Sequence, residues 1–118
     1  MIFIIRGIGT DIISINRIKE LKNIEQFARK ILSNQEFALY QSFVSDVRQT
    51  EFLAGRWAAK EAVYKALQST EMTLKYHDVV ILNDEHGAPY FENPVLQHLH
   101  ISISHCREYA TAFVIYEV

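Results

Sequence analysis

Two carboxylates stand in unusually apolar stretches of the sequence and could carry chemistry. Asp11 follows Gly7-Ile-Gly9-Thr among isoleucines, and Glu61 lies inside a long apolar run. Charged side chains are rarely placed among apolar residues without a partner or a purpose. Two carboxylates, together with water and a phosphate, would suit Mg²⁺, which prefers oxygen ligands and keeps several waters. Such a metal could stabilise the charge of a diphosphate during group transfer.

Lys65 lies one helical turn after Glu61 and could reach the same phosphates. A purely structural alternative stays open at this point. Glu61 and Lys65 could form an i,i+4 ion pair, and Asp11 could cap a helix that begins near Ser14. The helix that carries Glu61 has no polar face, and this weighs against the structural alternative.

That helix is predicted for residues 51–67, which contain no Pro, one Gly and many strong helix formers. Bulky side chains cover one arc of the helix, and Ala and Gly cover much of the remainder. A helix that is apolar all round is normally buried. Besides Glu51 at its start, four charged residues lie inside it, and the sequence suggests no role for Lys60; the four are Arg56, Lys60, Glu61 and Lys65.

The elements that should position these residues change in kind along the chain. Residues 2–13 predict a strand, whose glycines leave one face bare where a ligand or another backbone comes close. Helices are predicted over 14–21, 24–32 and 35–43, the third with a capping box formed by Ser33 and Glu36. Polar links are expected at 45–49 and 68–76.

The second half of the chain predicts strands over 79–82, 89–91, 99–105 and 109–118. Gly87 is expected to supply a positive φ in the turn at 83–87. The last strand is apolar on both faces, so it should be central or covered at an interface. The sequence therefore predicts one α+β domain over residues 1–118: an N-terminal strand, helices including a long central one, then an antiparallel β meander.

Composition narrows the class of protein. The 118 residues are 49% hydrophobic and 22% charged, as expected of a folded domain. A formal net charge of -2 argues against a general nucleic-acid binder. The single Cys106 excludes an internal disulfide framework and suits the cytoplasm. No stretch approaches the length of a membrane span, and a chain this short has a limited core, so an oligomer is expected.

Two histidine patterns and one basic segment are further candidates. His105 ends an alternating strand and is either a partly exposed strand-end residue or a phosphate or ribose contact. His98 and His100 lack a third zinc ligand nearby. Between residues 17 and 30, five basic residues and two acidic ones give a local charge of +3. This is either a solvated helix face or a docking surface for an acidic protein; the basic residues are Arg17, Lys19, Lys22, Arg29 and Lys30.

Three segments together resemble the motifs of the bacterial holo-(acyl-carrier-protein) synthases, which are 4′-phosphopantetheinyl transferases. They are Gly7-Ile-Gly-Thr-Asp11-Ile-Ile, Phe52-Leu-Ala-Gly-Arg-Trp-Ala-Ala-Lys-Glu61-Ala-Val-Tyr-Lys65-Ala-Leu67 and Ile101-Ser-Ile-Ser-His105. They occur in the family's order and spacing, and the match spans nearly the whole chain. The resemblance implies transfer of 4′-phosphopantetheine from coenzyme A to a serine of acyl carrier protein, with release of adenosine 3′,5′-bisphosphate, for fatty acid biosynthesis.

The resemblance also implies roles for individual residues. Asp11 and Glu61 would hold Mg²⁺, Glu61 would be the base acting directly or through water, and Lys65 would help neutralise the phosphates. Coenzyme A would be bound by Arg48, Arg56, Lys65, Gly87, Pro89, Ser104 and His105. The carrier protein would dock on Arg17, Lys22 and Arg29. Members of the family are trimers with active sites between subunits, which would account for the long helix with two buried faces.

The sequence departs from the family pattern at three places. Gln68-Ser69-Thr70 replaces the usual Gly-Thr-Gly, Ala88 replaces a Lys between Gly87 and Pro89, and Cys106 replaces a Thr. None is a predicted metal ligand, so we expect an active enzyme with altered affinity for coenzyme A. Two alternatives are a non-catalytic carrier-binding module and an enzyme that serves a polyketide or peptide synthetase carrier.

Overall fold

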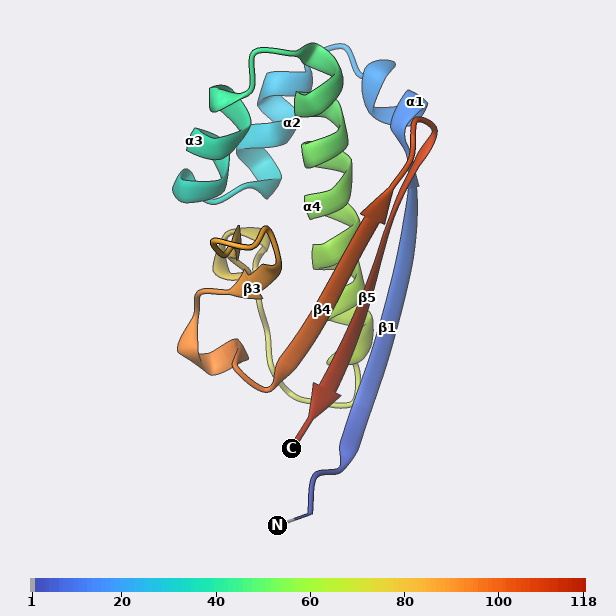
Figure 1. The fold of residues 1–118 in the computed structure, drawn as a ribbon. Helices are drawn as coiled ribbons and strands as arrows, with labels where there is room; N and C mark the ends of the chain where they lie inside the picture. Colours follow the sequence, from blue (N-terminus) through green and yellow to red (C-terminus); the bar gives the residue numbers. More distant parts are fainter. Residues whose placement is uncertain (1) are drawn as a thin grey trace.

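The computed structural model describes residues 2–118; Met1, the first residue of the predicted domain, lies outside the described residues. Strand β1 (Ile5–Ser14) leads into α1 (Ile15–Lys19), α2 (Ile24–Ile31), α3 (Asn34–Ser42) and the long α4 (Asp46–Ala66). Strands β2 (Ile81–Asn83), β3 (Pro89–Phe91), β4 (Leu99–His105) and β5 (Tyr109–Glu117) follow, with single 3₁₀ turns at Tyr76–Asp78 and Pro94–Leu96. Figure 1 shows the predicted order of strand, helices and strands.

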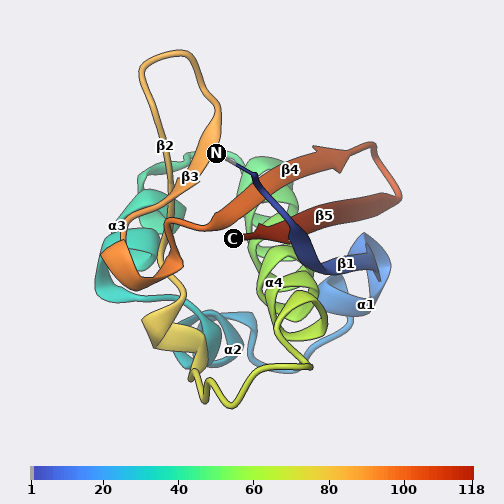
Figure 2. The same cartoon turned by 90° about the horizontal axis from the view of Figure 1, so that it is seen from below.

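Helix α4 runs through the middle of the molecule (Figures 1 and 2). The sheet of β1, β4 and β5 lies on one side of it, and α2, α3 and the β2–β3 hairpin lie on the other, while α1 stays beside the end of β1. Eleven residues of α4 are buried, including Leu53, Ala58 and Val63. Both faces are therefore covered within one chain, and the expectation that a neighbouring subunit buries the second face of this helix is wrong.

Helix α4 begins five residues before the predicted start at Glu51. Ser45 is its N-cap, and the Ser45 side chain accepts a hydrogen bond from the Arg48 backbone N–H at 3.3 Å. Asp46 in the first turn adds a favourable interaction with the helix dipole. The polar segment predicted as a link is thus the first turn of the helix.

The larger sheet has the strand order β1-β5-β4, with all neighbours antiparallel. This confirms that the last strand is central. The strands of the second half pair antiparallel as predicted but divide between two sheets, because β2 and β3 form a separate hairpin. Gly87, at φ 84°, supplies the expected positive φ in that hairpin.

Two glycines set the distance between the sheet and α4. A Cβ at Gly7 would collide with the Ala66 carbonyl, and one at Gly9 would collide with the Ala62 carbonyl. The bare strand face therefore admits another backbone, one of the two possibilities that the sequence left open. Asp11 is the next residue on this face, and its carboxylate is reached by Lys65 of α4.

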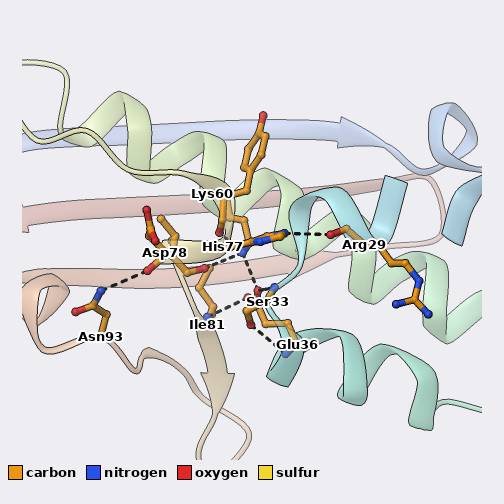
Figure 3. Close-up of polar contacts among 10 residues, drawn as sticks. Arg29, Ser33, Glu36, Lys60, His77, Asp78, Ile81 and Asn93 are labelled. Carbon is orange, nitrogen blue, oxygen red and sulfur yellow. Dashed lines mark hydrogen bonds and ion pairs between the residues drawn. The ribbon is translucent and has the colours of Figure 1, made fainter. Parts of the chain in front are cut away.

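A buried ion pair connects α3, α4 and the segment that enters β2 (Figure 3). The Lys60 ammonium lies 2.7 Å from Glu36 Oε1, and both side chains are fully buried. The predicted capping box is present, since Glu36 accepts the Ser33 backbone N–H at 2.9 Å while Ser33 Oγ accepts that of Glu36. Lys60, which the sequence could not explain, is thus a structural residue.

No other element of residues 2–118 covers the outer face of the larger sheet. Ile8, Ile12 and Phe113 project from β1 and β5 away from α4 and are 61%, 60% and 44% exposed. Among the described residues, no helix is both long and apolar enough to cross a bilayer.

Candidate active site

Asp11 and Lys65 meet in the crevice between β1 and α4. Lys65 Nζ lies 3.3 Å from Asp11 Oδ1 and donates a hydrogen bond to the Thr10 carbonyl at 2.9 Å. Within residues 2–118, Lys65 forms no ion pair with Glu61, and Ser14 caps α1 without a side-chain hydrogen bond. The structural alternative for these three residues is therefore wrong. Asp11 Oδ2 is buried and has no hydrogen-bond partner in the part of the chain that the structure describes.

Glu61 is held by two aromatic donors. The Tyr76 hydroxyl donates to Glu61 Oε1 at 2.7 Å, and Trp57 Nε1–H donates to the same oxygen at 3.3 Å. Burial, and then the hydrogen bond to Glu61, raise the pKa of Tyr76 above its usual 10.0, so the phenol stays protonated at neutral pH and remains a donor. Sequence reasoning missed both residues. The i,i+4 spacing of Trp57 and Glu61 could have revealed the first, whereas Tyr76 lies in a polar loop without any signal.

The residues present fit a Mg²⁺ site of the kind expected. Asp11 Oδ2 is a buried acceptor without a partner among residues 2–118, and Glu61 lies one helical turn before Lys65, which contacts Asp11 Oδ1. No group of three His, Cys, Asp or Glu residues gathers anywhere in the described chain. Two carboxylates are the usual protein contribution to a Mg²⁺ ion that keeps waters and binds substrate phosphates. In such a site Lys65 would exchange its contact with Asp11 for the phosphates.

Five of the residues predicted to bind coenzyme A line one groove of about 480 Å³. They are Arg48, Arg56, Gly87, Pro89 and His105, and the groove lies between α3, α4, the β2–β3 hairpin and the end of β4. The other lining residues are Leu39, Phe43, Glu51, Phe52, Gly55, Asn83 and Ile103. The structure therefore brings together most of the predicted nucleotide-binding residues.

Arg56 and His105 of the groove each contact a polar side chain of another element. Arg56 donates from Nη2 to Asn83 Oδ1 and lies over the Phe52 ring at 4.5 Å, while its buried Nε has no partner. Burial lowers the pKa of Arg56 to about 10, so the guanidinium is charged at neutral pH. His105 Nδ1 lies 3.4 Å from Glu51 Oε2, which ties β4 to α4. Asn83 and Glu51 are contacts that sequence reasoning missed.

Ser104 is not part of this groove. Side chains alternate along β4, so Ser104 projects from the face of the sheet opposite to that of His105 and Ile103. The carboxylate cluster of Asp11, Glu61 and Lys65 also lies apart from the groove. It faces β1, at the opposite edge of the sheet from β4, and Arg56 and Lys65 project from opposite sides of α4 because nine residues turn a helix by two and a half turns.

The three predicted docking residues differ in their contacts. The Arg17 guanidinium lies over the Trp57 ring at 5.1 Å, and Trp57 in turn contacts Glu61. Arg29 lies over Phe37 of α3 at 4.3 Å and pairs with Glu25 at 3.8 Å. Lys22 is exposed in the segment between α1 and α2. Of the three, Arg17 is the predicted docking residue that contacts Trp57, the indole donor to Glu61.

Comparisons with known proteins identify the family of the chain. The model of the 4′-phosphopantetheinyl transferase superfamily matches residues 7–114. The chain belongs to this superfamily. It is 46% identical over 114 residues to the holo-[acyl-carrier-protein] synthase of Lactococcus lactis subsp. cremoris (strain SK11), covering 94% of this chain and 96% of that protein. The corresponding enzyme of Anoxybacillus flavithermus is 44% identical, over 94% of each chain.

Solved structures of transferases of this superfamily share the fold. The crystal structure of a holo-(acyl-carrier-protein) synthase from Bacillus anthracis, in complex with CoA (3′,5′-ADP), superposes with a TM-score of 0.84 at 38% identity and covers 96% of both chains. The enzyme from Neisseria meningitidis gives 0.80 at 32% identity, over 95% of this chain and 98% of that one. These matches confirm the family and the α+β fold class predicted from the motifs.

Proposed function

We propose that the protein transfers 4′-phosphopantetheine from coenzyme A to a serine hydroxyl of apo acyl carrier protein. The serine oxygen forms a bond to the β-phosphorus of coenzyme A, and the bond between that phosphorus and the bridging oxygen breaks. Adenosine 3′,5′-bisphosphate leaves with the bridging oxygen, and the serine proton is released. The products are holo acyl carrier protein and the bisphosphate.

One observation carries this proposal. Asp11 has a buried oxygen without a partner among residues 2–118, and it pairs with Lys65, one helical turn from Glu61, in a chain of the 4′-phosphopantetheinyl transferase superfamily. A non-catalytic carrier-binding module would gain nothing from keeping a buried carboxylate oxygen without a partner, because such a group costs about 1–3 kcal/mol. The arrangement therefore favours an enzyme over that alternative.

The chain's own residues divide the work as follows. Asp11 and Glu61 would hold Mg²⁺, which when bound supplies positive charge to the diphosphate. Glu61 accepts the serine proton, directly or through water, while Oε1 is held by Trp57 and Tyr76. Lys65 moves from Asp11 onto a phosphate oxygen and helps neutralise its charge.

The groove residues bind the leaving nucleotide. The guanidinium groups of Arg56 and Arg48 bind its phosphates. A phosphate can accept two parallel hydrogen bonds from one planar guanidinium group. His105 lies at the mouth of the same groove and is 39% exposed in its side chain, so it can contact the 3′-phosphate or the ribose. Ala88 supplies no cation where the family pattern has Lys, and this supports an altered affinity for coenzyme A.

We also infer that three copies assemble and share their active sites. The groove and the carboxylate cluster lie at opposite edges of the sheet, and the apolar face between them is open at Ile8, Ile12 and Phe113. If three copies related by a threefold axis packed together through this face, the groove of one copy would lie beside the carboxylates of the next. Ser104, on the same outer face, would then reach the shared site.

The carrier protein is acidic, and Arg17 on α1 would receive it next to Trp57 and Glu61. We assign the enzyme to fatty acid biosynthesis and to the cytoplasm, where one exposed free thiol, Cys106, is compatible with reducing conditions.

The direct test is incubation of the protein with apo acyl carrier protein, coenzyme A and Mg²⁺, followed by mass spectrometry of the carrier. We expect a mass gain of one phosphopantetheine group, and none on a carrier whose acceptor serine is Ala. Carrier binding without a mass gain would overturn the proposal in favour of the non-catalytic module.

Sharing of the site is tested by mixing two inactive variants. Glu61→Gln removes the carboxylate, and Arg56→Ala removes a cation of the groove. If one site takes its two parts from two copies, unfolding and reassembling an equal mixture restores about one quarter of the wild-type sites. If each copy holds a whole site, the mixture stays inactive.

A further inference from the structure

Tyr76 is held from two directions by successive residues of α4. Its backbone carbonyl accepts a hydrogen bond from Lys60 Nζ at 2.8 Å, and its hydroxyl donates to Glu61 Oε1 at 2.7 Å. Successive helical residues project about 100° apart, so Tyr76 spans the helix surface between the two side chains. Its position is fixed at both the main chain and the tip of the side chain.

The support beneath Tyr76 is buried and fully bonded. Lys60 Nζ also contacts Glu36 Oε1 and donates to the Val79 carbonyl, both at 2.7 Å. Glu36 Oε2 in turn accepts the Ile81 backbone N–H at 3.0 Å (Figure 3). Because Lys60 and Glu36 are fully buried, the loop that carries Tyr76 cannot shift without exposing or breaking a buried ion pair.

The two donors to Glu61 both end on one of its oxygens. Tyr76 and Trp57 bond Oε1, and none of the hydrogen bonds within residues 2–118 ends on Oε2. A carboxylate held at one oxygen by two donors from different elements cannot rotate freely about its last torsion. The second oxygen then keeps all of its lone pairs for another partner.

We propose that Tyr76 is a positioning residue that fixes Glu61 Oε1, so that Oε2 is the oxygen offered to the metal and to the serine proton. The Lys60–Glu36 pair and the Trp57 indole complete this support. The inference rests on the proposed function, and it adds to that function the device that orients Glu61. Hydrogen-bond donors to ligating carboxylates commonly orient them in this way, and their loss costs about 10–100-fold in metal affinity or activity.

The test compares Tyr76→Phe with Tyr64→Phe. Both changes remove one hydroxyl from one of two adjacent rings, whose centroids are 5.5 Å apart, but only the first removes a donor to Glu61. Trp57 is the only tryptophan in the chain and bonds the same carboxylate, so its fluorescence reports metal binding without any turnover. Mg²⁺ is titrated into each protein with coenzyme A present, and melting temperatures confirm that each variant is folded.

For Tyr76→Phe we expect the midpoint of the Mg²⁺ titration to rise by about tenfold, with kcat falling and KM for the carrier unchanged. Tyr64→Phe should match the wild type in all three quantities. A Tyr76→Phe protein with wild-type midpoint and wild-type kcat would overturn the positioning role.

Glu61→Gln separates this inference from the proposed function. Loss of transfer in Glu61→Gln together with normal behaviour of Tyr76→Phe overturns the positioning role alone and leaves the proposed function standing. Wild-type transfer by Glu61→Gln overturns the proposed role of Glu61, and the positioning role falls with it.

Discussion

Replacement of Lys60 by Met should strongly destabilise the fold, because it removes one partner of a fully buried ion pair. Lys60 and Glu36 are 0% exposed, so solvent does not screen their interaction. Removal of one member leaves a buried, uncompensated charge, which typically costs about 3–5 kcal/mol. Two hydrogen bonds to the Tyr76 and Val79 carbonyls are lost at the same time. Against a usual total of about 5–15 kcal/mol, this is a large fraction of the free energy of unfolding.

The assay is urea unfolding of Lys60→Met, Glu36→Gln and the double variant, with Lys65→Met as a matched control. Gln at position 36 can keep the capping box, so Glu36→Gln tests the charge. The double variant should be less destabilised than the sum of the two single changes. Lys65 pairs with Asp11 but its side chain is half exposed, so its loss should cost about 1 kcal/mol or less. Equal effects of Lys60→Met and Lys65→Met would refute the reasoning.

Three further predictions concern two surface residues and a tyrosine of α4. Arg17→Glu should raise KM for the carrier protein, most strongly at low salt, because it reverses a charge beside Trp57; an unchanged KM at low salt would count against this docking site. Phe113→Lys places a charge on the open sheet face and should shift the sedimentation of the protein toward the monomer, whereas an unaltered oligomer would place the interface elsewhere. Burial raises the pKa of Tyr64 from 10.0 to about 12. Its folded pKa exceeds the unfolded one, so the stability that it contributes is present below pH 10 and is lost toward pH 12. Urea midpoints measured across this range should fall less steeply for Tyr64→Phe, and equal slopes would contradict the prediction.

Local patterns in the sequence predicted most of the fold. Three predicted features depend only on residues close together in the sequence, and all three are found. They are the alternating strand at residues 99–105, the capping box of Ser33 and Glu36, and the turn at Gly87. The start of α4 was misplaced because Ser45 and Asp46 are polar residues that suit both a loop and a helix N-terminus.

The rest depended on contacts between residues far apart in the sequence. Lys60 contacts Glu36, which lies 24 residues earlier in the chain, and it also donates hydrogen bonds to two backbone carbonyls of a loop. No local sequence pattern predicts such a pair. Lys65 forms its ion pair with Asp11 and not with Glu61, although the i,i+4 spacing in the helix favours Glu61. Tyr76 contacts Glu61 only because of the course of its loop. Glu36 of α3 and Lys60 of α4 together fix that course. The candidate metal ligands could be predicted because they are carboxylates in apolar sequence surroundings. The hydrogen-bond donors that hold Glu61 could not be predicted in this way.

The most direct test of the central claim is the mass of apo acyl carrier protein after incubation with coenzyme A, Mg²⁺ and either the wild-type protein or Glu61→Gln. Both proteins should show the same melting temperature to within the small effect of a partly buried, isosteric change. We predict a mass gain of one phosphopantetheine group with the wild type and none with Glu61→Gln. A carrier that gains the group equally fast from both proteins would contradict the role proposed for Glu61.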